Sequence, residues 1–412
     1  MEYGLIGERL GHSYSAEIHR AFGAYDYELV SLPPEKLEAF IRGREYRGLN
    51  VTIPYKQAVM PFCDEISGTA RKIGSVNTIV RRPDGSLYGD NTDYAGFAAM
   101  AARAGISFDG KKVAVLGSGG TSLTARAVAA GAGAAEIVTV SRKGDVTYDD
   151  LSKAADSDIV VNTTPVGMYP HNGESPVSLE RFPRCTGVVD VIYNPLRTAL
   201  VSEAAERGVA CTGGLYMLTA QAARAYALFC GAPLPEDRLE AVYRSLLASV
   251  ENIVLVGMPG SGKTTVGRIL AERLGRTFVD LDAAVEQKAG MTVPEIFARR
   301  GEETFRGYER EAAAEYGRQK GLVIAGGGGI VLSAQNRAAL RQNGRVYLLE
   351  RRLDRLETAG RPLSGDLSAL REMAARRQPL YALACDTAID NNAAPETAAE
   401  RIREDFYEAA CH

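Results

Sequence analysis

The stretch IVLVGMPGSGKTT, from Ile253 to Thr265, constrains the fold of this chain more than any other. Its first four residues are apolar and three of them are β-branched, which predicts a buried strand ending at Gly257. The spacing that follows is Gly-x4-Gly-Lys-Thr, and the next residues, VGRILAERL, keep apolar side chains at helical spacing up to Gly275. This strand, loop and helix predict a phosphate-binding loop, whereas the alternative is a glycine-rich turn that binds nothing.

Each residue type in the loop has a physical task. Glycines let successive backbone N–H groups point into one concavity, a lysine reaches the β- and γ-phosphates, and a threonine hydroxyl binds Mg²⁺. The predicted nucleotide-binding residues are Gly257, Gly260, Ser261, Gly262, Lys263, Thr264 and Thr265.

The loop also divides the chain of 412 residues, with about 250 residues before it and about 160 after it. A hydrophobic content of 46% and a charged content of 24% are typical of a globular protein. The net charge of −3 gives no reason to expect nucleic acid or an anionic membrane as a partner. The six cysteines are scattered, and we see neither a signal peptide nor a long apolar run. We therefore expect reduced thiols, no zinc site, no membrane insertion and a cytoplasmic location, and we leave the oligomeric state open.

A second glycine-rich turn lies within KKVAVLGSGGTSLTARAVAAGAGAAEIVTVSRK. We predict a strand at Val113–Leu116, a turn at Gly117–Gly120, a helix of small residues and a strand at Ile137–Val140, the first βαβ unit of a dinucleotide-binding domain. A site for NAD places Asp or Glu at the end of the second strand, but Ser141, Arg142 and Lys143 stand here. Cations at this point favour NADP, whose 2′-phosphate they bind; the alternative is a solvated strand end.

The remaining elements of the first half are read from apolar runs and turn residues. Taken singly, Lys56 is a surface lysine, Asp93 stabilises a helix start, and Ser13 or Ser15 caps a helix. We predict strands near Tyr3–Ile6, Tyr27–Ser31, Gly48–Ile53, Gly74–Val80 and Leu87–Asn91, further strands within 158–168 and 187–195, and helices at 213–231 and 236–249.

Ordered motifs along the first half nevertheless favour a functional interpretation of these residues. GHSYSAEIH, NVTIPYK, GSVNT, GDNTD, GSGGTS, NTTPVGMYP, DVIYNP and GGLYMLTAQAA follow one another, and over about 245 residues the chain resembles shikimate dehydrogenase. The resemblance implies that Lys56 and Asp93 form the catalytic pair. It implies that the substrate's hydroxyls and carboxylate are held by Ser13, Ser15, Thr52, Asn77, Asp93, Tyr193 and Gln221. The implied NADP(H)-binding residues are Gly117, Ser118, Gly119, Gly120, Thr121, Ser141, Arg142, Lys143, Val191 and Gly214.

The implied chemistry suits a chain with only four histidines. Hydride reduction of a ring ketone requires a proton for the developing alkoxide. Lys56, held near Asp93 and beside a bound cofactor, is able to supply that proton and to act as the base in the reverse direction.

The second half, about 160 residues, resembles shikimate kinase, because FVDLD, FRGYE, AGGGGIV, GRPL and RRQPLY follow the phosphate-binding loop in order. The resemblance implies that Asp282 orients the substrate hydroxyl, that Arg306 and Arg377 hold its carboxylate, and that Gly327, Gly328 and Gly329 let the ring approach the backbone. It further implies that Lys263 is catalytic, that Thr264 and Asp280 organise Mg²⁺, and that Arg361 lies on a lid over the ATP phosphates.

Together, the two resemblances imply an α/β protein that makes and then phosphorylates one metabolite. The expected fold is a two-domain shikimate dehydrogenase, with an α/β substrate domain (1–104 plus 218–249) and a Rossmann NADP domain (105–217), followed by a P-loop nucleoside-monophosphate-kinase-like domain (251–412). The expected reactions are the reduction of 3-dehydroshikimate to shikimate with NADPH and the phosphorylation of shikimate with ATP and Mg²⁺. Two alternatives stay open: a dehydrogenase that prefers quinate or NAD, and a second half that senses ATP or shikimate without turnover.

Overall fold

The computed structural model describes residues 1–10, 13–23, 25–356 and 367–409. The chain divides into two compact units, Met1–Tyr243 and Arg244–His412, and we describe each by itself. The α/β architecture predicted from the sequence is confirmed, with two sheets in the first unit and one in the second. Among the helices that the structure describes, none combines the length and the apolar character needed to cross a bilayer.

The first sheet of the first unit is mixed, with strand order β2-β1-β3-β5-β6-β4. β1 pairs in parallel with β2 and β3, whereas β5 runs antiparallel to β3 and β6. The turn between β5 and β6 contains Pro83-Asp84-Gly85, with Gly85 at a φ of 85°, which suits a tight turn. The strands are β1 (Tyr3–Gly7), β2 (Tyr27–Ser31), β3 (Gly48–Val51), β4 (Glu65–Ile66), β5 (Thr78–Arg81) and β6 (Leu87–Asp90).

The second sheet is parallel throughout, with strand order β11-β10-β9-β7-β8. β9 and β10 are buried along their whole length, as expected for strands covered on both faces. The strands are β7 (Lys112–Leu116), β8 (Glu136–Val140), β9 (Ile159–Asn162), β10 (Gly187–Asp190) and β11 (Ala210–Thr212).

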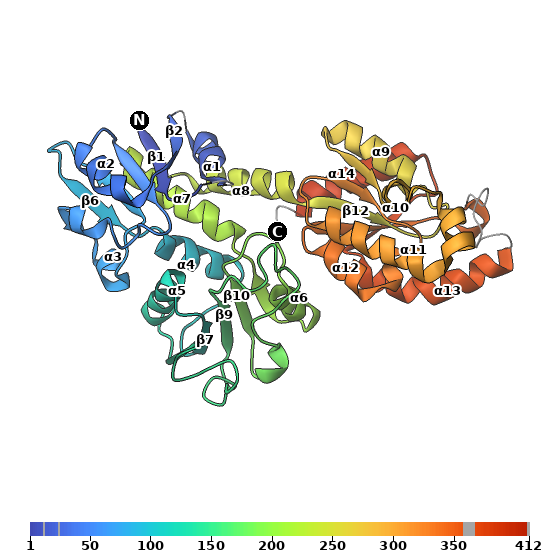
Figure 1. The fold of residues 1–412 in the computed structure, drawn as a ribbon, viewed down its shortest axis with the longest axis horizontal. Helices are drawn as coiled ribbons and strands as arrows, with labels where there is room; N and C mark the ends of the chain where they lie inside the picture. The colour runs from blue at the N-terminus through green and yellow to red at the C-terminus, as the bar shows by residue number, and fades with distance from the viewer. Residues whose placement is uncertain (11–12, 24, 357–366, 410–412) are drawn as a thin grey trace. The chain divides into compact units, whose positions relative to one another are not determined.

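Two helices, α4 (Asp93–Arg103) and α7 (Leu215–Cys230), pack against each other and join the two sheets of the first unit (Figure 1). Phe97 of α4 belongs to the core over the second sheet, and Phe229 of α7 packs with Tyr3 of the first sheet. Gly96 permits the close approach, because a Cβ there would lie 2.7 Å from the Met217 carbonyl oxygen. The other helices of this unit are α1 (Ser15–Phe22), α2 (Leu37–Gly43), α3 (Gly68–Ile73), α5 (Gly120–Gly131), α6 (Ala199–Glu206) and α8 (Glu236–Val250), which continues into the second unit.

One predicted strand was placed wrongly at its start. The sequence predicted a strand from Gly74 to Val80, but α3 ends at Ile73 and β5 begins only at Thr78. Ser67 caps α3 by accepting a hydrogen bond from the Ala70 amide, and Gly74 ends the helix with a φ of 76°. Local capping therefore takes precedence over the apolar run that suggested extended backbone.

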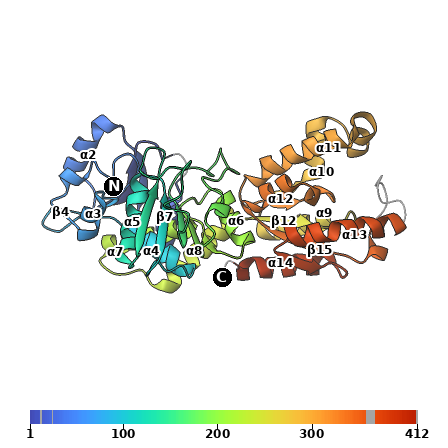
Figure 2. The ribbon, with the colours of Figure 1, turned by 90° about the horizontal axis from the view of Figure 1, so that it is seen from below.

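The second unit is built around one parallel sheet with strand order β13-β14-β12-β15-β16. Helices α9 and α14 cover one face, and α11, α12 and α13 cover the other (Figure 1, Figure 2). The strands are β12 (Asn252–Val256), β13 (Phe278–Asp280), β14 (Val323–Ala325), β15 (Gly344–Glu350) and β16 (Thr387–Asp390). The helices are α9 (Lys263–Leu274), α10 (Leu281–Ala289), α11 (Val293–Gly317), α12 (Ala334–Arg341), α13 (Leu367–Ala384) and α14 (Pro395–Ala409).

Candidate active sites

A cleft of about 360 Å³ opens in the first unit beyond the carboxyl ends of β1, β3 and β10. Eight of the residues predicted to bind substrate or to catalyse line it: Ser13, Ser15, Thr52, Lys56, Asn77, Asp93, Tyr193 and Gln221. Three of the predicted cofactor residues, Thr121, Val191 and Gly214, line it as well. Arg9 and Asn50, two further polar residues of this cleft, were not predicted from the sequence.

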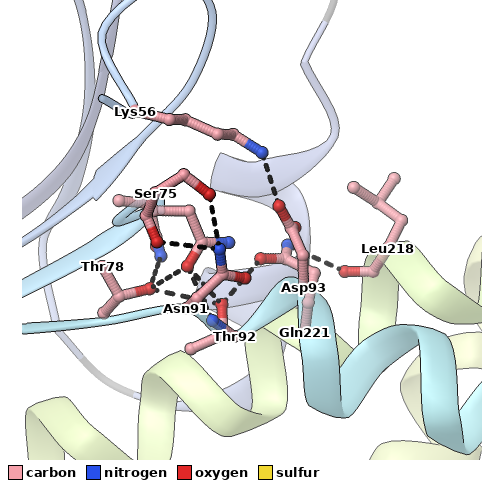
Figure 3. Close-up of polar contacts among 10 residues, drawn as sticks. Lys56, Ser75, Thr78, Asn91, Thr92, Asp93, Leu218 and Gln221 are labelled. Atoms are coloured by element: carbon pink, nitrogen blue, oxygen red, sulfur yellow. Dashed lines mark hydrogen bonds and ion pairs between the residues drawn. The ribbon is translucent and has the colours of Figure 1, made fainter. Parts of the chain in front are cut away.

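Lys56 and Asp93 form an ion pair inside the cleft, with Lys56 Nζ 2.5 Å from Asp93 Oδ2 (Figure 3). Lys56 lies in the turn after β3, where its carbonyl accepts the Val76 amide at 2.8 Å, and Asp93 is the first residue of α4. Both side chains are partly exposed, at 27% and 16%. The pair is therefore held by the fold and remains accessible to a ligand in the cleft.

A network of neutral polar side chains fixes the start of α4 beneath this pair (Figure 3). Asn77 Oδ1 accepts the Thr92 amide at 2.7 Å, and the Thr92 hydroxyl lies 3.2 Å from Gln221 Oε1. Gln221 Nε2 donates to the Leu218 carbonyl at 3.1 Å. Because Thr92 precedes Asp93 directly, these bonds fix the backbone from which the Asp93 side chain extends.

Ser13 lies on the loop that leads from β1 into α1, and Ser15 is the first residue of α1. Ser13 Oγ accepts the Ser15 amide at 3.2 Å and donates to Ser15 Oγ at 3.0 Å. The N-cap residue of α1 is Tyr14, which makes no side-chain cap. Neither serine thus occupies the N-cap position that the capping alternative required.

The turn between β7 and α5 has the geometry of an anion-binding helix start. Gly117 has a φ of 106°, and a Cβ there would lie 2.8 Å from Thr163 Oγ1. A Cβ on Gly119 or Gly120 would meet no atom within 4 Å, so the space beside these glycines is open, and no side chain caps the start of α5. Free amides at a helix N-terminus bind phosphate groups. This turn, which also contains Ser118, therefore fits the pyrophosphate of a dinucleotide.

The three residues after β8 lie at the neighbouring strand end. Ser141 is buried and its amide donates to the Val146 carbonyl at 3.0 Å, whereas Arg142 and Lys143 are exposed. Two exposed cations beside the β7–α5 turn fit the 2′-phosphate of NADP.

Asp190, at the end of β10, is a functional candidate that the sequence analysis missed. Its fully buried carboxylate accepts bonds from Asn162 Nδ2 at 3.1 Å, the Ile192 amide at 3.0 Å and Thr198 Oγ1 at 2.7 Å. Burial raises the pKa of Asp190 to about 6 despite these bonds. The network anchors the segment that carries Val191 and Tyr193 into the cleft. A lone acidic residue within the apolar run GVVDVI was the available signal.

A second cleft, of about 370 Å³, lies in the second unit at the carboxyl ends of β12, β13 and β14. The predicted residues that line it are Gly260, Gly262, Lys263, Thr264, Thr265, Asp280, Asp282, Arg306, Gly327, Gly328, Gly329 and Arg377. Gly257 and Ser261 belong to the same loop without lining the cleft, and Arg361 lies outside the described residues. The sequence analysis assigned no role to Glu286, Phe297 or Glu309, which also line it.

The phosphate-binding loop takes the conformation that its glycines permit. Gly257, Gly260 and Gly262 have φ values of 147°, 81° and 92°, and α9 begins directly after them. Lys263 Nζ donates to the carbonyls of Gly257 and Met258 at 2.9 and 3.0 Å, so its ammonium lies over the loop. This arrangement fits the phosphates of ATP.

The acidic side of the cleft fits a hydrated Mg²⁺. Thr264 Oγ1 donates to Asp280 Oδ2 at 2.7 Å. Within the described ranges, no three His, Cys, Asp or Glu side chains are grouped as a metal site. Mg²⁺ characteristically uses one or two protein oxygens together with water and phosphate oxygens, which is what Thr264 and Asp280 offer.

Asp282 faces the glycine run. A Cβ on Gly327 would lie 2.4 Å from Asp282 Oδ1, so only glycine allows this approach. Burial, and then the nearby charge of Asp280, raise the pKa of Asp282. A carboxylate in such surroundings is suited to accept a proton or a hydrogen bond from a substrate hydroxyl.

Two arginines supply positive charge to the same cleft. Arg306 Nη1 lies 3.0 Å from the buried Glu309, and a Cβ on Gly329 would lie 2.5 Å from the same nitrogen. Arg377 is 3% exposed and donates to the Gly328 carbonyl at 2.8 Å. Its Nε is buried and has no hydrogen-bond partner among the described residues. A buried guanidinium with an unused donor fits an anionic ligand.

Comparisons with known proteins give matches for both units of the chain. Residues 5–79 match the family model of the shikimate dehydrogenase substrate binding domain. The chain is 35% identical to shikimate dehydrogenase (NADP(+)) of Clostridium perfringens over 265 residues, which cover 59% of this chain and 97% of that protein. The chain belongs to the shikimate dehydrogenase family.

Solved structures of shikimate dehydrogenases match the same part of the chain. A chorismate mutase/shikimate 5-dehydrogenase fusion protein from Clostridium acetobutylicum is 38% identical, with a TM-score of 0.57, and the match covers 59% of this chain and 96% of that one. Shikimate 5-dehydrogenase from Thermus thermophilus, solved in complex with NADP(H) and shikimate, is 30% identical with a TM-score of 0.54 over 60% and 99% of the two chains.

The second unit has its own match, because residues 259–407 fit the shikimate kinase family model. The chain is thus a bifunctional enzyme of the shikimate pathway, with a shikimate kinase domain after the shikimate dehydrogenase part. Below, the dehydrogenase unit is Met1–Tyr243 and the kinase unit is Arg244–His412.

Proposed function

We propose that the dehydrogenase unit reduces 3-dehydroshikimate to shikimate with NADPH, and that the kinase unit phosphorylates shikimate at its 3-hydroxyl with ATP and Mg²⁺. The main support for the first reaction is the Lys56–Asp93 pair, which lies in one cleft with residues that we predict to bind the substrate and the cofactor. The two reactions support each other, since the product of the first is the substrate of the second.

Lys56 is the proton donor in this proposal. NADPH, when bound, supplies the hydride to the ring carbonyl carbon. The carbonyl oxygen then becomes an alkoxide, which takes a proton from the Lys56 ammonium. Asp93, 2.5 Å away, orients that ammonium and stabilises its charge before the transfer.

The substrate ring is positioned by neutral donors and acceptors around the pair. We assign its hydroxyls and carboxylate to the polar side chains Ser13, Ser15, Thr52, Asn77, Asp93, Tyr193 and Gln221, which line the cleft. The α4–α7 contact holds Gln221 against Thr92, so the substrate side of the cleft is rigid.

We propose NADP over NAD because of the strand end after β8. Arg142 and Lys143 are exposed there, and no acidic side chain of the segment Ser141–Lys143 is present to accept a ribose hydroxyl. The amide groups at the start of α5, from Gly119 to Thr121, would hold the pyrophosphate, and Val191 and Gly214 would face the nicotinamide end.

Phosphoryl transfer in the kinase unit is mainly positioning and charge stabilisation. Lys263 and the loop amides hold the ATP phosphates, while Thr264 and Asp280 hold the hydrated Mg²⁺. Asp282 orients the attacking hydroxyl. Arg306 and Arg377 hold the substrate carboxylate.

The three sheets also suggest a division of the chain into three functional domains. We propose a substrate domain at 1–104 plus 218–249, an NADP domain at 105–217 and a kinase domain at 251–412, although α7 continues across the boundary between 217 and 218. We further propose a cytoplasmic location, supported by the five free cysteines of the described chain: Cys63, Cys185, Cys211, Cys230 and Cys385.

A coupled assay on the full chain tests the proposal. It contains 3-dehydroshikimate, NADPH, ATP and Mg²⁺, and NADPH loss and phosphorylated shikimate are followed separately. We expect both signals, and we expect omission of NADPH to abolish both. NADPH loss without phosphorylated shikimate would refute the kinase reaction and favour a sensor, while equal or faster turnover with NADH, or with quinate in the reverse direction, would refute the proposed specificity.

A further inference from the structure

The charges of the side chains that line the dehydrogenase cleft do not sum to zero. Three of them line it: Arg9, Lys56 and Asp93. Lys56 and Asp93 neutralise each other at 2.5 Å, which leaves Arg9 as the uncompensated charge of the cleft lining. An unbalanced cation in a binding cleft attracts an anionic ligand group.

Arg9 lies on the loop between β1 and α1, four positions before Ser13. Its side chain is exposed and forms no hydrogen bond or ion pair with any residue in the described part of the chain. The N–H groups of the guanidinium are therefore available to a ligand of the cleft that Arg9 lines together with Ser13 and Ser15.

We propose that Arg9 binds the carboxylate of the dehydrogenase substrate and sets the specificity of this cleft for anionic ring acids. This inference rests on the proposed function, in which the substrate carries a carboxylate. The hydroxyls of Ser13, Ser15 and Tyr193 are neutral donors, so they orient a carboxylate without compensating its charge. A guanidinium both compensates the charge and matches the two oxygens in geometry.

The cofactor is the competing anion. Its predicted phosphate-binding groups, the Gly117–Thr121 turn and Arg142, follow strands of the second sheet, whereas Arg9 follows β1 of the first sheet on the loop that also carries Ser13. The position of Arg9 therefore favours the substrate carboxylate over a cofactor phosphate.

Steady-state kinetics of Arg9→Gln in the full chain test this assignment, with shikimate oxidation by NADP⁺ as the readout. We expect the KM for shikimate to rise by about tenfold and kcat to stay within about twofold, because the lost contact is made equally in the ground and transition states. The KM for NADP⁺ should be unchanged, and Arg9→Lys should recover part of the loss.

Two comparisons make the test specific. With shikimate methyl ester, which lacks the charge, wild type and Arg9→Gln should have the same kcat/KM. Arg20→Gln, which removes an exposed arginine of α1 that does not line the cleft, should behave as wild type with both substrates.

Three results would overturn the inference: a KM for shikimate within twofold of wild type in Arg9→Gln, an equal loss with the methyl ester, or a rise confined to the KM for NADP⁺, which would assign Arg9 to the cofactor. Absence of dehydrogenase turnover in the wild type would instead refute the proposed function itself.

Discussion

The Lys56 Nζ and Asp93 Oδ2 atoms lie 2.5 Å apart although 37 positions separate the two residues in the chain. Each residue taken singly has an ordinary structural explanation, as a surface lysine or a helix-start aspartate. Their proximity inside a cleft supports the acid–base role that we propose for them, because general acid catalysis requires a proton donor that is held in position. Three predictions concern single side chains.

Lys56→Ala should lower dehydrogenase kcat by about 10²–10⁴-fold, the range for loss of a general acid. Kinase turnover of the same preparation should be unchanged. Lys72→Ala, which removes an exposed lysine of α3, is the matched control. Retention of full dehydrogenase activity in Lys56→Ala would exclude the acid–base role of Lys56.

Asp282→Asn should abolish phosphorylation of shikimate and leave ATP binding intact, because Asp282 faces the glycine run Gly327–Gly329 and is not part of the phosphate-binding loop. Product formation and the Kd for ATP, measured by calorimetry, separate the two effects. Glu303→Gln, an exposed acid on α11, controls for the change of charge. Phosphorylation at the wild-type rate would remove Asp282 from the mechanism.

Asp190 should make the stability of the dehydrogenase unit depend on pH. Its folded pKa is raised to about 6 from the usual 3.8, so the folded state holds a proton that the unfolded state has already lost between these values. Stability should therefore fall as the pH rises from about 4 to about 6, by up to ~3 kcal/mol.

Urea unfolding of wild type and Asp190→Asn at several pH values measures this dependence. The difference between the two free energies of unfolding should change over that pH range and be constant above it. A difference that does not vary with pH would show that the Asp190 carboxyl is not titrating there.

At the scale of elements, α11 carries Phe305, Arg306 and Glu309 to the kinase cleft, and its backbone is interrupted at one residue. Gly301 has a φ of 81° and a ψ of 167°, a conformation that is essentially restricted to glycine. The strain at position 301 would come from the backbone conformation and not from a steric clash, because no atom lies within 4 Å of a Cβ placed there.

Gly301→Ala should destabilise the kinase unit by ~1–3 kcal/mol and raise the kinase KM for shikimate, because relief of the strain redirects the second part of α11. Gly307→Ala is the matched control on the same helix. Position 307 has regular helical backbone and open surroundings, so alanine there should be neutral or stabilising by up to ~1 kcal/mol. Equal effects of the two substitutions would contradict a special role for the bend.

At the scale of the whole molecule, each unit has its own sheets and its own hydrophobic core. Ligands should therefore stabilise the two units separately. In a thermal scan of the full chain we expect two transitions, one raised by NADP⁺ and the other by ATP with Mg²⁺. At 100 times the Kd, each ligand should add ~2.7 kcal/mol, or roughly 5–10 °C. A single transition raised by both ligands would show that the units unfold together.

Much of the fold was predictable because its signals are local. The β12 strand, the phosphate-binding loop and the start of α9 follow from glycine spacing and apolar periodicity within one short stretch, and the β7–α5–β8 unit follows in the same way. The error in the predicted start of β5 also has a local cause, because Ser67 caps α3 just before the stretch that was predicted to be extended.

The sequence by itself determined the α/β class, the two glycine-rich turns between strand and helix and, through ordered motifs, the families of both halves. Only the tertiary structure decided that Arg9 faces the dehydrogenase cleft beside a neutralised ion pair, that Asp190 is buried at the end of β10, and that Glu309 anchors Arg306. The physical reason is the sequence separation between the residues that determine each property. Backbone conformation depends mainly on neighbours within a few residues, whereas burial, charge balance and the meeting of side chains depend on segments that only the folded chain brings together.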